Sequence, residues 1–514
     1  MRILLLLLLL VVGSCSAYKM LVFVPNMANS QVQFCTRVAA ALADAGHDVT
    51  MAMITHLSDF KHDVKIPKNI KVYEVDAFVE GLTQEYMHGE QAKFMFRDVS
   101  PLEPEMFRLM NLFTTLQKDG CRMLLRNKEF LKWLESEKFD IAFAYIYSTC
   151  PVGIIHHAKI PTWIWLNSGG LMDYVANTIG VPIIPSYVPP MMMEAHDTLT
   201  FYERIKSFIG HTLLGLLSRS MMATKYTEVF REEIDPNFPH TMDLAEKCPL
   251  VMVNSNELYD LPRPTLAKVV NIGGLGVGFD AAKPLTGEFE KIINSGKGTI
   301  VFSFGSVAAA HKMPEFWKSA LLEAFAEFAD YQFVMRYVEN DLNDRLPKNV
   351  HLFKWLPQKD LLLHNNTKAF ISHGGYNSLQ ESISSGTPLV TIALFGDQPK
   401  NSKIALKHGI AVNIAKSEIS KETIVSKLKE ILENPMYSNN VKRISQMVRK
   451  QPTKPAELLV KWSEFVAEFK NSGSGGLWNT NYTNEWNLGR DFAWLNNSEY
   501  PNLLMILRSV LSFC

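Results

Sequence analysis

The stretch KAFISHGGYNSLQESISSGTPLV, residues 368–390, places a run of polar residues between two apolar runs. The first apolar run is typical of a buried strand that ends near Ser372, and Gly374 and Gly375 allow a tight turn after it. A helix should follow, with Gly386 as its left-handed C-cap before the next strand. The stretch therefore predicts a helix whose N-terminus lies at the carboxyl edge of a parallel sheet.

Ligands of open α/β sheets bind at that edge, and a helix N-terminus offers free N–H groups and a partial positive charge to an anion. Asn377 and Ser378 are residue types that favour helix starts, and His373 needs a polar partner that a diphosphate would supply. Ser378 and Glu381 have the spacing of a capping box, which would satisfy the first helical turn without a ligand. Phosphate binding and simple capping are thus both compatible with these residues.

Seven further apolar runs bounded by turn residues alternate with helical patterns along the chain. With the strand at 368–372 they form two series of four, at 20–24, 48–54, 139–145 and 162–166, and then at 298–304, 331–337, 368–372 and 388–394. Strands that alternate with helices predict a parallel sheet covered on both faces. Two series predict an α/β chain with two doubly wound domains.

The expected organisation begins with a signal peptide at 1–17, which has one basic residue, an apolar core and small residues before the cut. An N-terminal domain at 18–255, a C-terminal domain at 256–450, a helix at 451–470 and an atypical tail at 471–514 follow. The tail opens with a flexible linker composition and contains no stretch of about 20 apolar residues. Location in the lumen of the endoplasmic reticulum or secretion is expected, with membrane anchoring only if this tail is not the native one.

Three glycosylation sequons, which begin at Asn365, Asn481 and Asn496, agree with a lumenal glycoprotein. Basic and acidic residues balance at 52 each, so the sequence gives no reason to expect a nucleic-acid partner. The five cysteines beyond the signal are scattered, which predicts no metal cluster. One disulfide is possible, although its partners cannot be read from the sequence, but buried apolar thiols are favoured for all five cysteines.

Residues 184–210 are rich in proline and methionine before an amphipathic stretch. They would suit an apolar acceptor pocket or a peripheral membrane contact, and equally a packed surface helix. Residues 31–45 predict a helix that ends at Gly46, so His47 should have a structural role at the corner before the next strand.

Four short segments together are more specific than any one of them. They are WLPQ at 355–358, SHGGYNSLQES at 372–382, GTPLV at 386–390 and FGDQPKNS at 395–402. In this order and spacing they resemble the signature of the UDP-glycosyltransferases, which include the glucuronosyltransferases of detoxification. The resemblance extends over about residues 19–470 and implies the GT-B architecture of two facing Rossmann-like domains. The N-terminal domain would hold a small lipophilic acceptor and the C-terminal domain a UDP-sugar.

The resemblance also implies a role for each residue of the signature. Trp355 would stack on uracil, Gln358 would bond to the nucleotide, Glu381 would accept from the ribose hydroxyls, and Asp397 with Gln398 would bind the sugar. The diphosphate would be held at Ser306, His373, Gly375, Asn377 and Ser378. UDP-glucose or UDP-glucuronate would be the co-substrate, with glucose favoured, and neither a metal nor another cofactor is expected.

The catalytic base pair of the family is replaced in this chain. The family uses a histidine after the first strand, sixteen residues before the one that matches His47, and an aspartate after a later strand; here Gln31 and Tyr145 occupy these positions. An amide is no general base near neutral pH, and losing such help typically lowers a rate by about 10²–10⁴. We therefore expect a slow transferase, a silent UDP-sugar- or lipophile-binding relative or, less favoured, a hydrolase or epimerase. A homo-oligomer also stays open.

Overall fold

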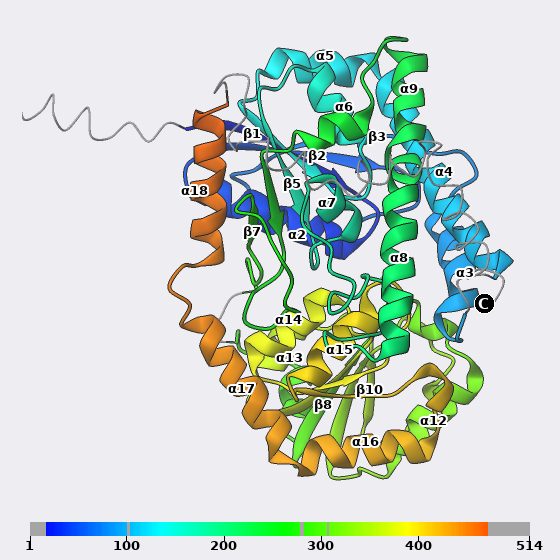
Figure 1. Cartoon of the computed structure of the whole chain (residues 1–514). Coiled ribbons are helices and arrows are strands. Elements are labelled where there is room, and N and C mark those ends of the chain that lie inside the picture. The colour runs from blue at the N-terminus through cyan, green and yellow to red at the C-terminus, as the bar shows by residue number, and fades with distance from the viewer. Residues whose placement is uncertain (1–16, 100–102, 278–281, 306–307, 471–514) are drawn as a thin grey trace, which may run out of the picture.

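The computed structural model describes residues 17–99, 103–277, 282–305 and 308–470. The expected signal peptide up to residue 16, Ser306, the sequons at Asn481 and Asn496, and the tail from 471 lie outside the described residues. The described chain forms two lobes, each a parallel sheet with helices on both faces (Figure 1). The prediction of an α/β chain with two doubly wound domains is confirmed.

The first sheet contains seven parallel strands in the order β3-β2-β1-β4-β5-β6-β7. They are β1 (Lys19–Pro25), β2 (Asp48–Thr55), β3 (Lys71–Asp76), β4 (Ile141–Tyr145), β5 (Trp163–Asn167), β6 (Leu250–Val253) and β7 (Val269–Asn271). All residues of β4 and β5 are buried, which explains why these strands are continuous apolar runs. The sheet takes β7 from beyond residue 255, where the sequence placed the domain boundary.

The second sheet contains six parallel strands in the order β10-β9-β8-β11-β12-β13. They are β8 (Gly298–Ser303), β9 (Tyr331–Arg336), β10 (Val350–Phe353), β11 (Thr367–Ser372), β12 (Leu389–Thr391) and β13 (Ala411–Asn413). In each sheet the order reverses direction beside a central strand, β1 or β8, and this reversal is where ligands bind in such sheets.

Helices connect the strands and cover both faces of each sheet (Figure 1). Those of the first lobe are α2 (Asn29–Asp44), α3 (Gln84–Met95), α4 (Pro104–Arg126), α5 (Lys128–Glu137), α6 (Cys150–His157), α7 (Asp173–Thr178), α8 (Phe201–Arg219), α9 (Lys225–Glu233) and α10 (Thr241–Glu246). Those that follow are α11 (Glu288–Ile293), α12 (Glu315–Ala326), α13 (Gln358–Leu363), α14 (Tyr376–Ser385), α15 (Gln398–Lys407), α16 (Lys421–Glu433), α17 (Pro435–Arg449) and α18 (Pro455–Glu468). Among the described residues no helix is both long and apolar enough to cross a bilayer.

The last helix, α18, returns from the second lobe and packs on α2 of the first (Figure 1). Its residues Leu459 and Val466 belong to the core of the first lobe. Its Glu464 lies 3.2 Å from Nε2 of His47, whose Nδ1 lies 3.3 Å from the backbone N–H of Tyr18. His47 therefore has the structural role predicted for it.

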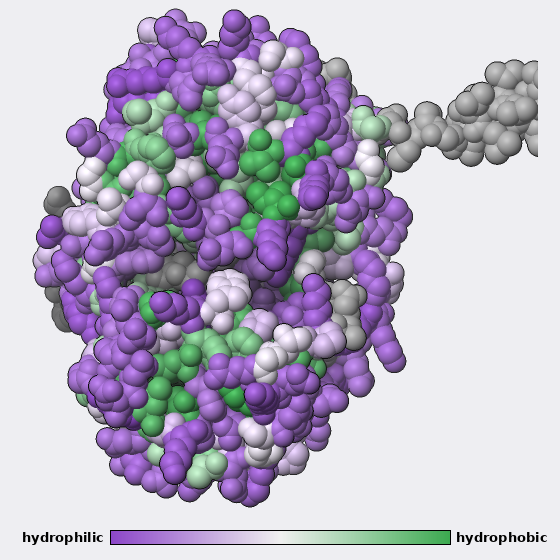
Figure 2. Space-filling view, turned by 180° about the vertical axis from the view of Figure 1, so that it is seen from behind, coloured by the Kyte–Doolittle hydropathy of each residue, from purple (hydrophilic) through white to green (hydrophobic). Residues whose placement is uncertain are grey.

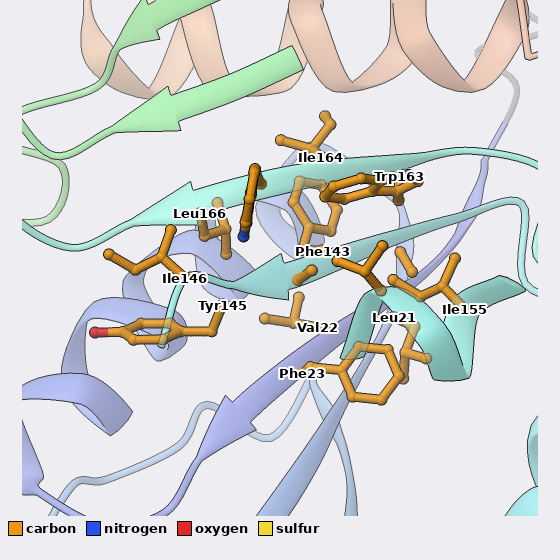
Figure 3. Packing of buried hydrophobic residues seen from close by; sticks show 14 of the residues in the cluster. Leu21, Val22, Phe23, Phe143, Tyr145, Ile146, Ile155, Trp163, Ile164 and Leu166 are labelled. Atoms are coloured by element: carbon orange, nitrogen blue, oxygen red, sulfur yellow. The ribbon is translucent and has the colours of Figure 1, made fainter. Parts of the chain in front are cut away.

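Strands β1, β4 and β5 contribute to the core of the first lobe (Figure 3). Leu21, Val22 and Phe143 pack inside this cluster, and Tyr145 lies at the end of β4 with its hydroxyl pointing away from it (Figure 3). The core thus fixes the ends of these strands, and it delivers the Tyr145 hydroxyl to the carboxyl edge of the sheet.

Two cysteines of the first lobe form a disulfide. Cys121 of α4 and Cys150 at the start of α6 are bonded, with Cα atoms 6.0 Å apart, whereas Cys35 and Cys248 are free and buried. The preference for buried thiols was therefore wrong for this pair. The two cysteines are 29 positions apart in sequence, and the segment between them includes β4, which returns the chain to α4. No local spacing in the sequence predicts such a pairing.

Candidate active site

The loop between β11 and α14 leaves a helix N-terminus without a side-chain cap. Helix α14 begins at Tyr376, Gly375 is its N-cap, and Gly374 has a positive φ of 78°. Ser378 is therefore the third residue of the helix and Glu381 the sixth, so these two do not form the capping box that their spacing allowed. The first N–H groups of α14 remain available to an anion.

His373 is a partly buried neighbour of this N-terminus. A Cβ on Gly305 or Gly375 would lie 2.9 Å or 2.7 Å from its ring, so both glycines are needed for the ring to fit. Burial, assisted by the charge of Arg336, lowers the pKa of His373 to about 4. Its Nδ1 has no hydrogen-bond partner among the described residues. At neutral pH His373 offers a ligand hydrogen bonding rather than positive charge.

Glu381 is held from both lobes. Nε2 of Gln358 donates to its Oε2 over 2.6 Å, and Nη2 of Arg37 from α2 lies 3.8 Å from its Oε1. Both charged side chains are largely buried, with 14% of Arg37 and 12% of Glu381 exposed. The carboxylate expected to receive the ribose is thus oriented by a residue of the opposite lobe, which the sequence analysis missed because no pattern joins α2 to α14.

Trp355 follows β10 and is 58% exposed, so it is not a core aromatic. The guanidinium of Arg336, the last residue of β9, lies 5.6 Å from its ring centre, and the Nη1 of Arg336 donates to the carbonyl of Gly305. Arg336 was also missed by the sequence analysis. Its position at the carboxyl end of a predicted strand was the available signal.

Asp397 and Gln398 lie at the start of α15, beside the glycine turn. Asn401 connects the two features, since its Nδ2 donates to Asp397 Oδ2 over 2.9 Å and to the carbonyl of Gly374 over 3.0 Å. Burial raises the pKa of the Asp397 carboxyl. The Oε1 of Gln398 accepts from the backbone N–H groups of residues 394 and 395, so its Nε2 is the amide atom that could donate to a ligand.

Gln31 and Tyr145 meet around a second tyrosine in the first lobe. The hydroxyl of Tyr145 donates to Ser168 Oγ, and its ring centre lies 4.9 Å from that of Tyr147. The Tyr147 hydroxyl interacts with Tyr145, Gln31 and Ser168. Burial raises the pKa of both phenols, and the nearby Asp397 adds to the rise for Tyr147. Neither phenol is a base near neutral pH, and Tyr147 connects this cluster to the expected sugar site.

A cavity opens at this edge of the first sheet, with an empty volume of about 410 Å³ that continues to open solvent. Its lining comprises Phe23, Pro25, Ile54, His56, Gln117, Cys121, Leu124, Tyr145, Tyr147, Ser148, Cys150 and Pro151. The space-filling view shows a hollow between the lobes with a largely hydrophilic rim (Figure 2). An apolar cavity with a few polar groups is typical of a site for a small organic molecule.

The arrangement of the chain agrees with comparisons to known proteins. Residues 19–474 match the family described as UDP-glucoronosyl and UDP-glucosyl transferase. The chain belongs to this family of UDP-glycosyltransferases. It is 29% identical to the putative UDP-glucuronosyltransferase ugt-50 of Caenorhabditis elegans, over 89% of this chain and 87% of the relative. Identity to human UDP-glucuronosyltransferase 2B7 is also 29%, over 84% of this chain and 81% of the human protein.

Solved GT-B glycosyltransferases share the fold. The glycosyltransferase of kitacinnamycin superposes with a TM-score of 0.58 at 15% identity, covering 88% of this chain and 99% of its own. LpCGTa, solved in complex with UDP, gives a TM-score of 0.55 at 14% identity, covering 88% of this chain and all of its own. The predicted family and the GT-B fold are both confirmed. The roles of the individual site residues remain predictions, and Ser306 lies outside the described residues.

Proposed function

We propose that this UDP-glycosyltransferase moves glucose or glucuronate from a UDP-sugar to a small lipophilic acceptor, with inversion at the anomeric carbon. The observation that carries the proposal is the position of Tyr147, which lies in the lining of the apolar cavity and within electrostatic reach of Asp397. An acceptor in the cavity would therefore face a sugar held at α15. The N-terminus of α14, which has no side-chain cap, lies beside α15 and would bind the diphosphate.

Catalysis at this site would depend on the positioning of the two substrates and on stabilisation of the UDP leaving group. The N–H groups at the start of α14, with the nearby cation of Arg336, would stabilise the negative charge of departing UDP. Holding two substrates in attack geometry supplies a large part of most rate enhancements. The acceptor must lose its proton without help from Gln31, so amines, thiols and acidic phenols should react faster than alcohols.

The first test is release of UDP from UDP-glucose and from UDP-glucuronate, each with and without a panel of phenol, amine and thiol acceptors. We expect UDP release that depends on the acceptor, together with a glycosylated product. Release without an acceptor would favour a hydrolase. Tight binding of a UDP-sugar without turnover would favour the alternative of a silent binding protein, which the replaced base pair supports. No affinity for any uridine diphosphate compound would contradict both.

The variant Trp355→Ala should bind UDP about 5–150 times more weakly, because stacking of a base on an aromatic ring contributes roughly 1–3 kcal/mol. Calorimetric titration with UDP measures the change. Phe316→Ala is the matched control, since Phe316 is a similarly exposed aromatic of the same lobe at 60% and lies on α12. Equal UDP affinity of the two variants would remove Trp355 from the proposed uracil site.

We further propose a lumenal or secreted location and a peripheral membrane contact. Disulfides persist in oxidising compartments, and Cys121–Cys150 is one. The contact would use helix α8, on which Phe201, Phe208 and Leu216 are 80%, 56% and 56% exposed. Replacing these three residues with serine should reduce sedimentation of the purified chain with lipid vesicles, and unchanged sedimentation would contradict the contact.

A further inference from the structure

His56 is a buried histidine of the acceptor cavity that has no part in the proposed transfer step. It follows β2 directly, 5% of it is exposed, and it lines the same cavity as Tyr145 and Tyr147. Strands β2 and β4 lie on either side of β1, so their ends are two strand spacings, about 10 Å, apart. His56 thus lies across the cavity from the two tyrosines.

The orientation of the ring follows from its partners. Nδ1 lies 3.3 Å from the carbonyl oxygen of Ala77, which can only accept, so Nδ1 carries the hydrogen. Nε2 is then an acceptor, and within the described residues the only hydrogen bond of this ring is the one at Nδ1. Gly120 of α4 allows the ring to lie here, because a Cβ at that position would be 2.3 Å from Nδ1. The imidazole is therefore held between the carbonyl of Ala77 and the backbone of α4 at Gly120.

The ring is a hydrogen-bond acceptor and a weak base. Burial lowers the pKa of His56 to about 4, so the imidazole is uncharged at neutral pH. A base this weak contributes little to removing a proton from a hydroxyl group. His56 also lies across the cavity from Tyr147, the lining residue whose pKa is raised by burial and by the charge of Asp397 in the expected sugar site. A role in binding the far end of the acceptor therefore fits His56 better than proton abstraction.

We propose that Nε2 of His56 accepts a hydrogen bond from a second donor group of the acceptor, at the end opposite the glycosylated group. The preferred acceptors are then flat apolar molecules about two fused rings long, with an O–H or N–H at each end. The inference rests on the proposed function, because it assumes that the cavity is the acceptor site. It adds a residue and a chemical class to that site.

Three naphthalenes of similar size test the inference: 2,6-dihydroxynaphthalene, 6-methoxy-2-naphthol and 2-naphthol. The first has a donor at both ends, whereas the methoxy group of the second offers only an acceptor. We expect KM of the unmodified chain to be roughly 5–100 times lower for the diol than for the methoxy compound, because the latter leaves Nε2 unpaired. His56→Leu should bring this ratio close to one, and His56→Gln should keep part of it through the amide oxygen.

His157→Leu is the matched control, a histidine on α6 of the same lobe outside the cavity lining. It should keep the ratio of the unmodified chain. A purely structural role of His56 would change KM for all three compounds by the same factor, so a ratio that survives in His56→Leu would overturn the inference. A ratio near one in the unmodified chain would do the same.

Calorimetry separates a failure of the transferase proposal from a failure of the His56 inference. If none of the three compounds is glycosylated, their dissociation constants in the presence of saturating UDP are compared instead. The same preference for the diol, lost in His56→Leu, would support the His56 site in a silent binding protein. Equal dissociation constants, or no binding at all, would overturn it. UDP affinity, which depends on the second lobe, and the melting temperature show whether each variant is folded.

Discussion

A chain that carries both Gln31→His and Tyr145→Asp should glycosylate alcohols and phenols about 10²–10⁴ times faster than the unmodified chain. The new imidazole would take the proton of the attacking hydroxyl, and the new carboxylate would hold its ring in place. The geometry favours this pair. Gln31 lies in the first turn of α2, which follows β1, and Tyr145 is the last residue of the adjacent strand β4. Both present side chains interact with Tyr147.

Steady-state assays of product formation measure the gain, and the two single variants are its controls. Gln31→His alone should give a smaller gain because its ring lacks an orienting carboxylate, and Tyr145→Asp alone should give none. The gain should fall away as pH drops through the range in which imidazole becomes protonated, near its usual pKa of about 6.5. A double variant that binds UDP normally but shows no gain would contradict the assignment of these two positions.

Removal of the disulfide should cause the largest loss of stability. Cys121 and Cys150 are 29 residues apart in sequence. A bond that closes a loop of this length stabilises the fold by about 3–4 kcal/mol, because it lowers the conformational entropy of the unfolded chain. The double variant Cys121→Ala and Cys150→Ala should therefore melt roughly 6–16 °C lower in a lobe of this size. The bond joins α4 to α6 and both cysteines line the cavity, so acceptor affinity should fall as well.

Scanning calorimetry at one fixed scan rate measures the shift, and reductant supplies an internal control. Dithiothreitol should lower the melting temperature of the unmodified chain toward that of the double variant, and it should leave the double variant unchanged. Cys35 and Cys248 are free thiols in both proteins and do not contribute to the difference. If reductant changes the unmodified chain by less than a degree, the bond is absent in solution.

The donor half of the site could be predicted largely from the sequence. The segment around His373 lies in one strand-turn-helix unit, so local rules place its polar groups at one sheet edge, and Gly386 indeed ends α14 with a φ of 73°. Even here, local rules did not predict the charge state of the His373 imidazole. Burial beside Arg336, which belongs to another strand, lowers the pKa of His373 to about 4 and leaves its imidazole neutral.

Local sequence patterns were enough to predict the two α/β lobes, the glycine turn before α14 and the replacement of the family's base pair by Gln31 and Tyr145. The contact of Arg37 with Glu381, the bond between Cys121 and Cys150, and the place of His56 in the cavity lining became visible only in the folded chain. The physical reason is the order of strands in the sheet. Periodicity and turn residues define each strand, but which strands become neighbours depends on packing among segments far apart in the chain.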